Sequence, residues 1–345
     1  MRLIKILSIL GIVSLLAASC NFFGGSPVKT AGALRSANGG TDWQSANAIK
    51  DKLEGSLAGT NISGLKFKPG SLETIFASSY NNGFFVSEDG GNSWRQILSN
   101  FYVYDFAFDP ASSDAIYVAG IAADHGRVLV TRDMGKSWQE IYNEGTSGNG
   151  VRAVMADTNL RLYIGLEDGN MVRSEDAGLS WKLVKNFETR INTIRSYNGS
   201  LYVLARSKGL FRSDDGQNFS NLTGEVGSED GFHIFSNVGT YNQFAITVGS
   251  IYLTTNNGLF RSFDQGSSWA RLILPLQDQS ASILPIATSQ TNDSLVYTAV
   301  GSTIYKSTDG GNTWQTQNSN TTALITALLV HPQNPQLVYA GAFAQ

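Results

Sequence analysis

Acidic side chains are the first candidates for chemistry in this chain of 345 residues. A retaining or inverting glycosidase needs two carboxyl groups at a set separation. Asp105, Asp109 and Glu144 are candidates, but nothing in the sequence places two of them face to face. Six other Asp residues recur in a repeated motif, where they could bind calcium or act as acids. Because a catalytic group is not needed six times, we interpret the repeated Asp residues as structural.

A short motif, Ser/Thr-x-Asp-x-Gly-x-x-Trp, recurs along the chain, and we call each copy a box. The closing aromatic residues of successive boxes lie 44, 43, 38, 50 and 45 residues apart. A period in the forties with four short strands per unit is typical of a β-propeller. The boxes are Ser87–Trp94, Thr131–Trp138, Ser174–Trp181, the shortened Ser213–Phe219, Ser262–Trp269 and Ser307–Trp314.

The two ends of the chain carry complementary halves of one further unit. A seventh box, Ser36–Trp43, has Asn38 in place of Asp, and there is no room for two strands before it. The segment Ile325–Phe343 reads as the first two strands of a unit and then stops. We therefore predict an all-β fold, a seven-bladed β-propeller over residues 34–345, whose last blade is closed by N- and C-terminal strands. Such closure removes the open edges that a linear stack would expose.

Each box has a local physical explanation. The Ser/Thr and Asp side chains can accept hydrogen bonds from backbone N–H groups of a tight turn. The Trp begins the outermost strand and buries its ring between adjacent sheets. Glycines also recur in or beside the turn between the second and third strands of each unit, where we expect positive φ. These glycines are Gly83, Gly126, Gly169, Gly209, Gly258 and Gly301.

The starts of the innermost strands are expected to line the mouth of the central channel, on the face opposite the boxes. Tyr104, Arg152, Asn192 and Asn242 would form a mixed aromatic, cationic and amide set there, suited to the polar groups of a peptide or glycan. The alternative is that these side chains merely solvate the channel. Alignment of the units places seven residues at equivalent positions: Ser63, Tyr104, Arg152, Asn192, Asn242, Leu284 and Thr326.

The longest insertion, residues 220–240, is predicted to rise over the same face. It carries Phe232 and His233, which we add to the predicted binding residues because long loops on a rigid scaffold concentrate binding function. His125 has no second cluster of ligands near it in the sequence, and His331, followed by Pro332, reads as a turn residue. We predict no metal site and no cofactor.

The first residues, 1–19, read as a secretory signal, because a short apolar run follows Arg2 and Lys5 and ends in small residues. Cys20, the single cysteine of the chain, follows directly. The segment Leu15–Cys20 resembles a bacterial lipobox. This predicts a lipidated Cys20, a flexible tether within residues 20–33, and a membrane-anchored protein on the outward or periplasmic face of a bacterial cell envelope. The alternative is ordinary signal cleavage with an incidental cysteine.

The charge of the chain argues against nucleic acid as a partner. The formal net charge is −3, and loss of two cationic residues with the leader changes it to −5. No basic excess is left to neutralise phosphates.

The boxes are similar to those of the Asp-box (BNR-repeat) propellers, a superfamily that includes sialidases, xyloglucanases, sortilin-type receptors and photosystem II assembly-factor propellers. No Arg-Ile-Pro segment of the sialidase type precedes the first box. The resemblance to xyloglucanases implies two facing propellers, whereas this chain accounts for one ring. With the lipobox, the resemblance implies an exported propeller that is not an enzyme and that binds a protein partner or a surface glycan. A glycoside hydrolase acting on an extracellular polysaccharide is the alternative.

Overall fold

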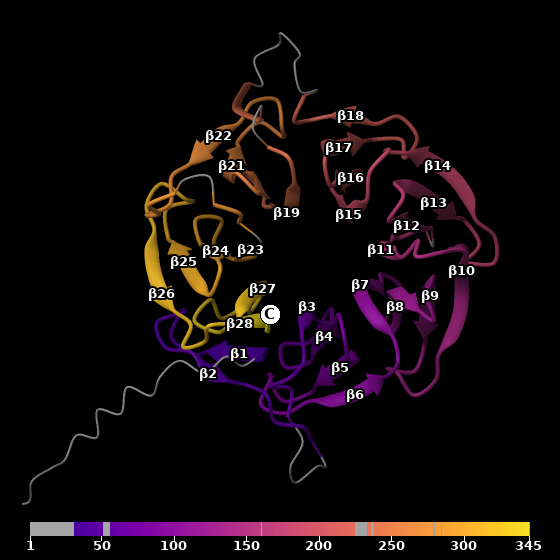
Figure 1. Ribbon diagram of the computed structural model, residues 1–345, viewed down its shortest axis with the longest axis horizontal. Helices are drawn as coiled ribbons and strands as arrows, with labels where there is room; N and C mark the ends of the chain where they lie inside the picture. Colours follow the sequence, from indigo (N-terminus) through magenta and orange to yellow (C-terminus); the bar gives the residue numbers. More distant parts are fainter. Residues whose placement is uncertain are drawn as a thin grey trace, which may run out of the picture.

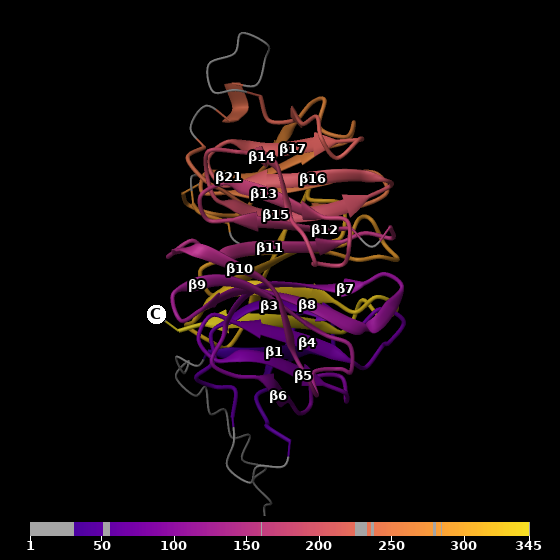
Figure 2. The ribbon, with the colours of Figure 1, turned by 90° about the vertical axis from the view of Figure 1, so that its right-hand side faces the viewer.

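The computed structural model describes residues 31–50, 56–159, 161–224, 233–235, 238–278, 281–283 and 285–344. Seven four-stranded antiparallel sheets are arranged in a ring about a central axis, as Figure 1 shows in the view down the short axis. Figure 2 shows the ring from its edge, with the strands running between its two faces. The prediction of a seven-bladed propeller is confirmed.

In blades 1 to 6 the first strand along the chain lies beside the channel, and the fourth strand lies at the outer rim. Blade 1 contains β3 (Ile62–Phe67), β4 (Ile75–Ser79), β5 (Gly83–Ser87) and β6 (Arg95–Leu98). Blade 2 contains β7 (Tyr102–Asp109), β8 (Ser112–Ala122), β9 (His125–Thr131) and β10 (Gln139–Ser147). Blade 3 contains β11 (Val151–Ala156), β12 (Leu162–Leu166), β13 (Asn170–Ser174) and β14 (Lys182–Asn186).

The remaining blades repeat this order. Blade 4 contains β15 (Ile191–Tyr197), β16 (Ser200–Ala205), β17 (Gly209–Ser213) and β18 (Ser220–Asn221), followed by a 3₁₀ turn, η1 (His233–Phe235). Blade 5 contains β19 (Tyr241–Ile246), β20 (Ile251–Thr255), β21 (Gly258–Ser262) and β22 (Ala270–Leu272). Blade 6 contains β23 (Ile286–Thr288), β24 (Val296–Val300), β25 (Thr303–Ser307) and β26 (Gln315–Asn318).

Blade 7 joins the two ends of the chain. Its strands are β27 (Leu324–Val330), β28 (Val338–Phe343), β1 (Gly32–Ser36) and β2 (Gln44–Ser45), in that order from the channel outward. Strand β1 pairs antiparallel with β28 over its whole length, from Gly32 opposite Ala342 to Ser36 opposite Val338. The predicted closure is therefore confirmed, and β1 begins two residues before the predicted start of the ring at Leu34.

The boxes form one repeated turn whose hydrogen bonds span at most four residues. In the first full copy the Ser87 hydroxyl accepts a hydrogen bond from the Gly91 N–H at 2.8 Å, and the Asp89 carboxylate accepts one from the Ser93 N–H at 2.9 Å. The Ser93 hydroxyl donates to the same carboxylate at 2.6 Å. Because these bonds are local, the turn can form from the box residues alone.

The box of blade 7 uses the same geometry with two side chains exchanged. Its Asn38 accepts from the Asp42 N–H at 2.9 Å, and its amide then donates to the Asp42 carboxylate at 2.7 Å. In the other full copies the carboxylate is the third box residue and a hydroxyl is the donor. The exchange keeps one anion and one donor in the turn, which explains why Asn38 is tolerated there.

Four of the box tryptophans connect neighbouring blades by a hydrogen bond. The Trp94 indole N–H donates to the carbonyl of Ala46 at 2.8 Å, and the indoles of Trp138, Trp181 and Trp269 make the corresponding bonds to the preceding blade. Within the described part of the chain, the indole N–H groups of Trp43 and Trp314 have no hydrogen-bond partner. The hydrogen bond is therefore a feature of four blade interfaces rather than of all seven.

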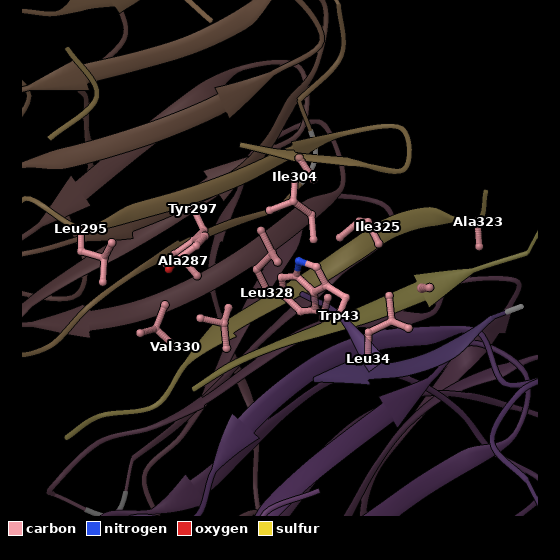
Figure 3. Close-up of a cluster of buried hydrophobic side chains, with 14 residues drawn as sticks. Leu34, Trp43, Ala287, Leu295, Tyr297, Ile304, Ala323, Ile325, Leu328 and Val330 are labelled. Atoms are coloured by element: carbon pink, nitrogen blue, oxygen red, sulfur yellow. The ribbon is translucent and has the colours of Figure 1, made fainter. Parts of the chain in front are cut away.

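Each pair of neighbouring blades encloses a hydrophobic core of its own. Figure 3 shows the core between blades 6 and 7, where Leu34 of β1 and Trp43, just before β2, lie beside Tyr297 and Leu328. The closing blade thus buries residues from both ends of the chain, and this apolar burial supports the strand pairing that seals the ring.

Gly126 departs from the predicted role of the turn glycines. The other five have positive φ, but Gly126 lies inside β9, and the turn of blade 2 is formed by Ala123 and Asp124 with φ of 48° and 65°. A Cβ atom on Gly126 would lie 2.3 Å from the carbonyl oxygen of Asn149. Close backbone approach, and not positive φ, explains this glycine.

The predicted leader, Cys20 and most of the tether lie outside the described residues. Within the described residues, no helix is long and apolar enough to cross a membrane.

Candidate functional site

The predicted channel-mouth residues occupy a repeated irregularity of the innermost strands. In six blades the pairing of the first two strands skips one residue, which leaves that residue in a β-bulge. A bulge redirects a side chain away from the regular sheet. The bulged residues are Ser63, Tyr104, Arg152, Asn192, Asn242 and Thr326, which all line one cavity of about 500 Å³ in the channel. Leu284, the predicted equivalent in blade 6, lies outside the described residues.

Four of the six bulged side chains connect their blade to the next one. Each donates a hydrogen bond to a backbone carbonyl at or near the start of the neighbouring innermost strand. The bonds are Ser63 to Val103 at 2.7 Å, Asn192 to Tyr241 at 2.7 Å, Asn242 to Ile283 at 2.6 Å and Thr326 to Ile62 at 2.6 Å. The amide donors of Asn192 and Asn242 are thus engaged within the ring.

Tyr104 and Arg152 break this pattern. The Arg152 guanidinium lies over the Tyr104 ring, 3.8 Å from its centroid, and its Nε donates to Glu167. Tyr80 lies beside them, with its ring centroid 6.0 Å from that of Tyr104 and 6.1 Å from that of Phe343. Tyr80 is 38% exposed, and its partial desolvation at the channel mouth raises its pKa above the ordinary value. These residues form an aromatic and cationic surface at the mouth of the channel, of the kind that anchors ligands.

Arg190 extends the cationic surface. Its Nε donates to the side chain of Asn192 at 2.9 Å, and its guanidinium lies 3.8 Å from the carboxylate of Glu167. Burial lowers the pKa of Arg190 from its ordinary value. Glu167 therefore forms ion pairs with two guanidinium groups, those of Arg152 and Arg190.

A second cluster, centred on the charged Asp105, joins four blades. Its carboxylate accepts from Lys66 Nζ at 2.8 Å and from Arg195 at 3.2 Å. The backbone N–H groups of Phe106 and Val154 also donate to it, at 2.9 and 3.2 Å. Burial opposes ionisation of Asp105, but Arg195 and Lys66 together hold its pKa below the ordinary value. Burial lowers the pKa of Lys66 to about 8, against the opposing attraction of Asp105.

Sequence reasoning considered Asp105 but missed Lys66 and Arg195. Alignment of the units held a signal for such partners, because Asp105 stands where five other blades have uncharged residues, namely Gly64, Ala153, Thr193, Gln243 and Ala327. A single carboxylate at a position that faces the channel demands cationic partners.

The three acidic residues that we considered for catalysis do not converge. Among the described residues that line the cavity, Asp105 is the one acidic side chain. Asp109, at the other end of β7, accepts from the Tyr117 hydroxyl at 3.1 Å. Glu144, on the outermost strand β10, accepts from the Tyr142 hydroxyl at 2.7 Å. An ionised, doubly paired Asp105 is also unsuited to donate a proton.

The histidines that are described hold backbone groups. His331 Nδ1 accepts from the N–H groups of Gln333 and Asn334 at 3.1 and 2.9 Å, as a turn residue does. His125 lies 3.0 Å from the carbonyl of Glu144. No group of three metal-binding side chains occurs in the portion of the chain that the structure covers.

Phe232 and the side chain of His233 lie outside what the structure describes, so their predicted role stays a prediction. The described part of the same insertion packs into the ring. Phe235 is 2% exposed, and its ring lies 4.7 Å from that of Phe260 and 5.6 Å from that of Trp269. This part of the insertion fills the core between blades 4 and 5.

Comparison with known proteins agrees with this architecture. The family model described as the DUF6242 beta propeller domain matches residues 111–218. The chain is a seven-bladed β-propeller. The matched span runs from blade 2 to the box of blade 4 and includes Arg152, Arg190 and Asn192 of the cavity.

Three relatives illustrate two different kinds of similar protein. A xyloglucanase of Hypocrea jecorina is 24% identical over 288 residues, which are 79% of this chain and 33% of the relative. The crystal structure of the GH74 xyloglucanase from Xanthomonas campestris superposes with a TM-score of 0.68 at 16% identity, over 88% of this chain and 52% of that one. The structure of YCF48 bound to D1 peptide superposes with a TM-score of 0.62 at 18% identity, over 83% of this chain and 93% of that one.

The share of each relative that this chain covers differs between the xyloglucanases and YCF48. This chain spans a third or less of the length of the curated xyloglucanases that it matches. It spans nearly all of the YCF48 chain. At these identities the structural matches establish the shared fold alone.

Proposed function

We propose that the channel mouth binds a segment of a partner polypeptide without catalysing a reaction on it. The observation that carries this proposal is the stacked pair of Tyr104 and Arg152 at the bulge position of blades 2 and 3. In four other blades this position holds a side chain that donates a hydrogen bond to the next blade. A guanidinium stacked on an aromatic ring is an anchor for peptide groups at protein interfaces.

The charges around the cavity favour an acidic segment. Four cations, Lys66, Arg152, Arg190 and Arg195, line the cavity. Two carboxylates, Asp105 and Glu167, pair with them. The site therefore carries an excess of two positive charges in a chain whose net charge is −3. A local excess of one sign attracts ligands of the other sign.

The comparison with YCF48 bound to D1 peptide supports a peptide ligand, because that propeller of similar length binds a peptide. The proposal for this chain depends on its own side chains and not on the identity of that peptide.

The test is capture of partners from detergent-solubilised membranes by the full chain. The double variant Tyr104→Ala/Arg152→Ala should lose at least tenfold in capture, and the capture by the wild type should weaken as salt rises. Arg132→Ala, which removes an exposed arginine in the box of blade 2, is the matched control and should behave as wild type. Unchanged capture by the double variant would place the binding surface elsewhere.

A glycoside hydrolase is the second candidate, favoured by the match to xyloglucanases over 79% of the chain. Asp105 is the candidate acid that lines the cavity, although its pairing with Lys66 and Arg195 opposes that role. Release of reducing ends from xyloglucan by the wild type, and its loss in Asp105→Asn, would support hydrolysis over binding. No release by the wild type would favour the binding function.

We further propose that the ring is held at a membrane through lipid on Cys20, as the lipobox-like segment suggests. Labelled fatty acid should enter the wild type and should not enter Cys20→Ala. Equal labelling of both would exclude Cys20 as the attachment point.

A further inference from the structure

A second pocket lies outside the channel, between blades 1 and 2. Its volume is about 370 Å³, within the range of small-ligand sites. It is built from the turn after β4, the outer strand β6, the link to β7 and the tip of the blade 2 hairpin. The residues that line it are Asn81, Asn82, Gln96, Ser99, Asn100, Tyr102, Ile121, Ala122 and Ala123.

The unusual length of the blade 2 hairpin creates one wall of this pocket. Strand β8 has 11 residues, whereas the corresponding strands of the other blades have five or six. The extra residues include Ile121 and Ala122, and Tyr102 pairs with Ile121 across the sheet. The pocket therefore depends on a strand length that the corresponding strands of the other blades do not share.

The polar side chains that line the pocket are exposed, and hydrogen bonds within the ring hold two of them. The Asn82 amide donates to Thr60 at 3.0 Å, and the Gln96 amide donates to the Asn82 backbone carbonyl at 2.6 Å. Both side chains are thereby oriented, while their carbonyl oxygens accept no hydrogen bond from the described residues. Likewise, within that part of the chain, the Asn100 side chain and the Tyr102 hydroxyl have no hydrogen-bond partner.

The pocket also carries no charge and has one exposed aromatic ring. None of its lining residues is ionised at neutral pH, in contrast to the four cations of the channel. Tyr102 is 51% exposed, an unusual state for a tyrosine of a blade. Oriented amides match the alternating donors and acceptors of sugar hydroxyls, and a tyrosine offers an apolar face with a polar tip to a sugar ring.

We infer that this pocket, which we call the amide pocket, binds one or two residues of a neutral carbohydrate. The ligand is uncharged because the amide pocket offers no ion to pair with an anionic sugar. This inference goes beyond the proposed channel function and does not depend on it. A peptide backbone is the competing ligand.

The experiment is calorimetric titration of the full chain with neutral hexasaccharides of glucose, mannose and galactose, and with hexagalacturonate as the acidic probe. At least one neutral hexasaccharide should bind, with an affinity that does not change between 50 and 500 mM salt. Tyr102→Ala should weaken this binding about tenfold or more, and Tyr102→Phe should weaken it about threefold.

Asn100→Gly provides a second variant that keeps the fold. Asn100 has φ of 56°, which glycine adopts without strain, so the substitution removes the amide alone. It should also weaken binding about tenfold. Tyr104→Ala, in the channel, should leave the affinity unchanged, which separates this site from the channel site.

Three results would overturn the inference. These are no binding of any neutral hexasaccharide, equal affinities of Tyr102→Ala, Asn100→Gly and wild type, or binding of hexagalacturonate alone. Displacement of the sugar by an uncharged peptide at similar concentration would assign the amide pocket to peptides instead.

Discussion

The box tryptophans offer a test of how the blades are held together. Trp94 and Trp43 are 1% and 3% exposed, and both pack in the core between two blades. They differ in one respect: the Trp94 indole donates to the carbonyl of Ala46, whereas the Trp43 indole has no partner among the described residues. The pair therefore isolates the contribution of the hydrogen bond.

We expect Trp94→Phe to destabilise the protein more than Trp43→Phe. Both substitutions lose similar apolar area, so that cost cancels in the comparison. Trp94→Phe also loses a hydrogen bond, a loss of about 1 kcal/mol, and leaves a buried carbonyl unpaired. Trp43→Phe instead removes a buried N–H that is unsatisfied, which recovers about 1 kcal/mol or more. The difference in free energy of unfolding should be about 2 kcal/mol.

The assay is thermal unfolding of both variants beside the wild type under the same conditions. At this chain size a difference of about 2 kcal/mol corresponds to a Tm difference of about 3 °C. Blade 4 shows that the ring accepts phenylalanine at this position, because Phe219 ends its box and packs edge-on against Phe187 at 5.3 Å. Equal losses in Tm for the two variants would refute the reasoning, since they would show that the indole hydrogen bond adds nothing to the blade interface.

Three further substitutions, at two places in the ring, test the charged groups. Asp105→Ala should cost about 3 kcal/mol or more near pH 7, because it leaves Lys66 and Arg195 without their shared anion. The folded protein lowers the pKa of Asp105, so its contribution is present above the ordinary carboxyl pKa and is lost as pH falls below about 4. Denaturant titrations at pH 7 and pH 3 should therefore show a large gap between wild type and variant that narrows in acid; a constant gap would contradict this. In the blade 7 box, Asn38→Asp places a carboxylate against that of Asp42 and should cost about 1 kcal/mol, and adding Asp42→Ser should recover it by restoring the hydroxyl donor of the other boxes. A double variant no more stable than the single one in thermal unfolding would rule this out.

The amino-acid sequence by itself determined the ring. The hydrogen bonds of each box span at most four residues, so the motif carries the information for its own turn. The spacing of the boxes then determined the number of blades, and the half-units at the two ends determined their joining. Alignment of the units also placed Tyr104 and Arg152 at equivalent positions, because the innermost strands of six blades have a bulge there.

The tertiary structure alone decided which side chains meet across the channel. Asp105 and Arg195 are 90 residues apart and come from blades 2 and 4, and Lys66 comes from blade 1. The stacking of Arg152 on Tyr104, and the placing of Tyr80 and Phe343 beside them, likewise depend on how neighbouring blades are oriented. Repeat spacing gives the order of blades around the ring but not the direction of each side chain, because that direction follows from sheet twist and from packing between blades.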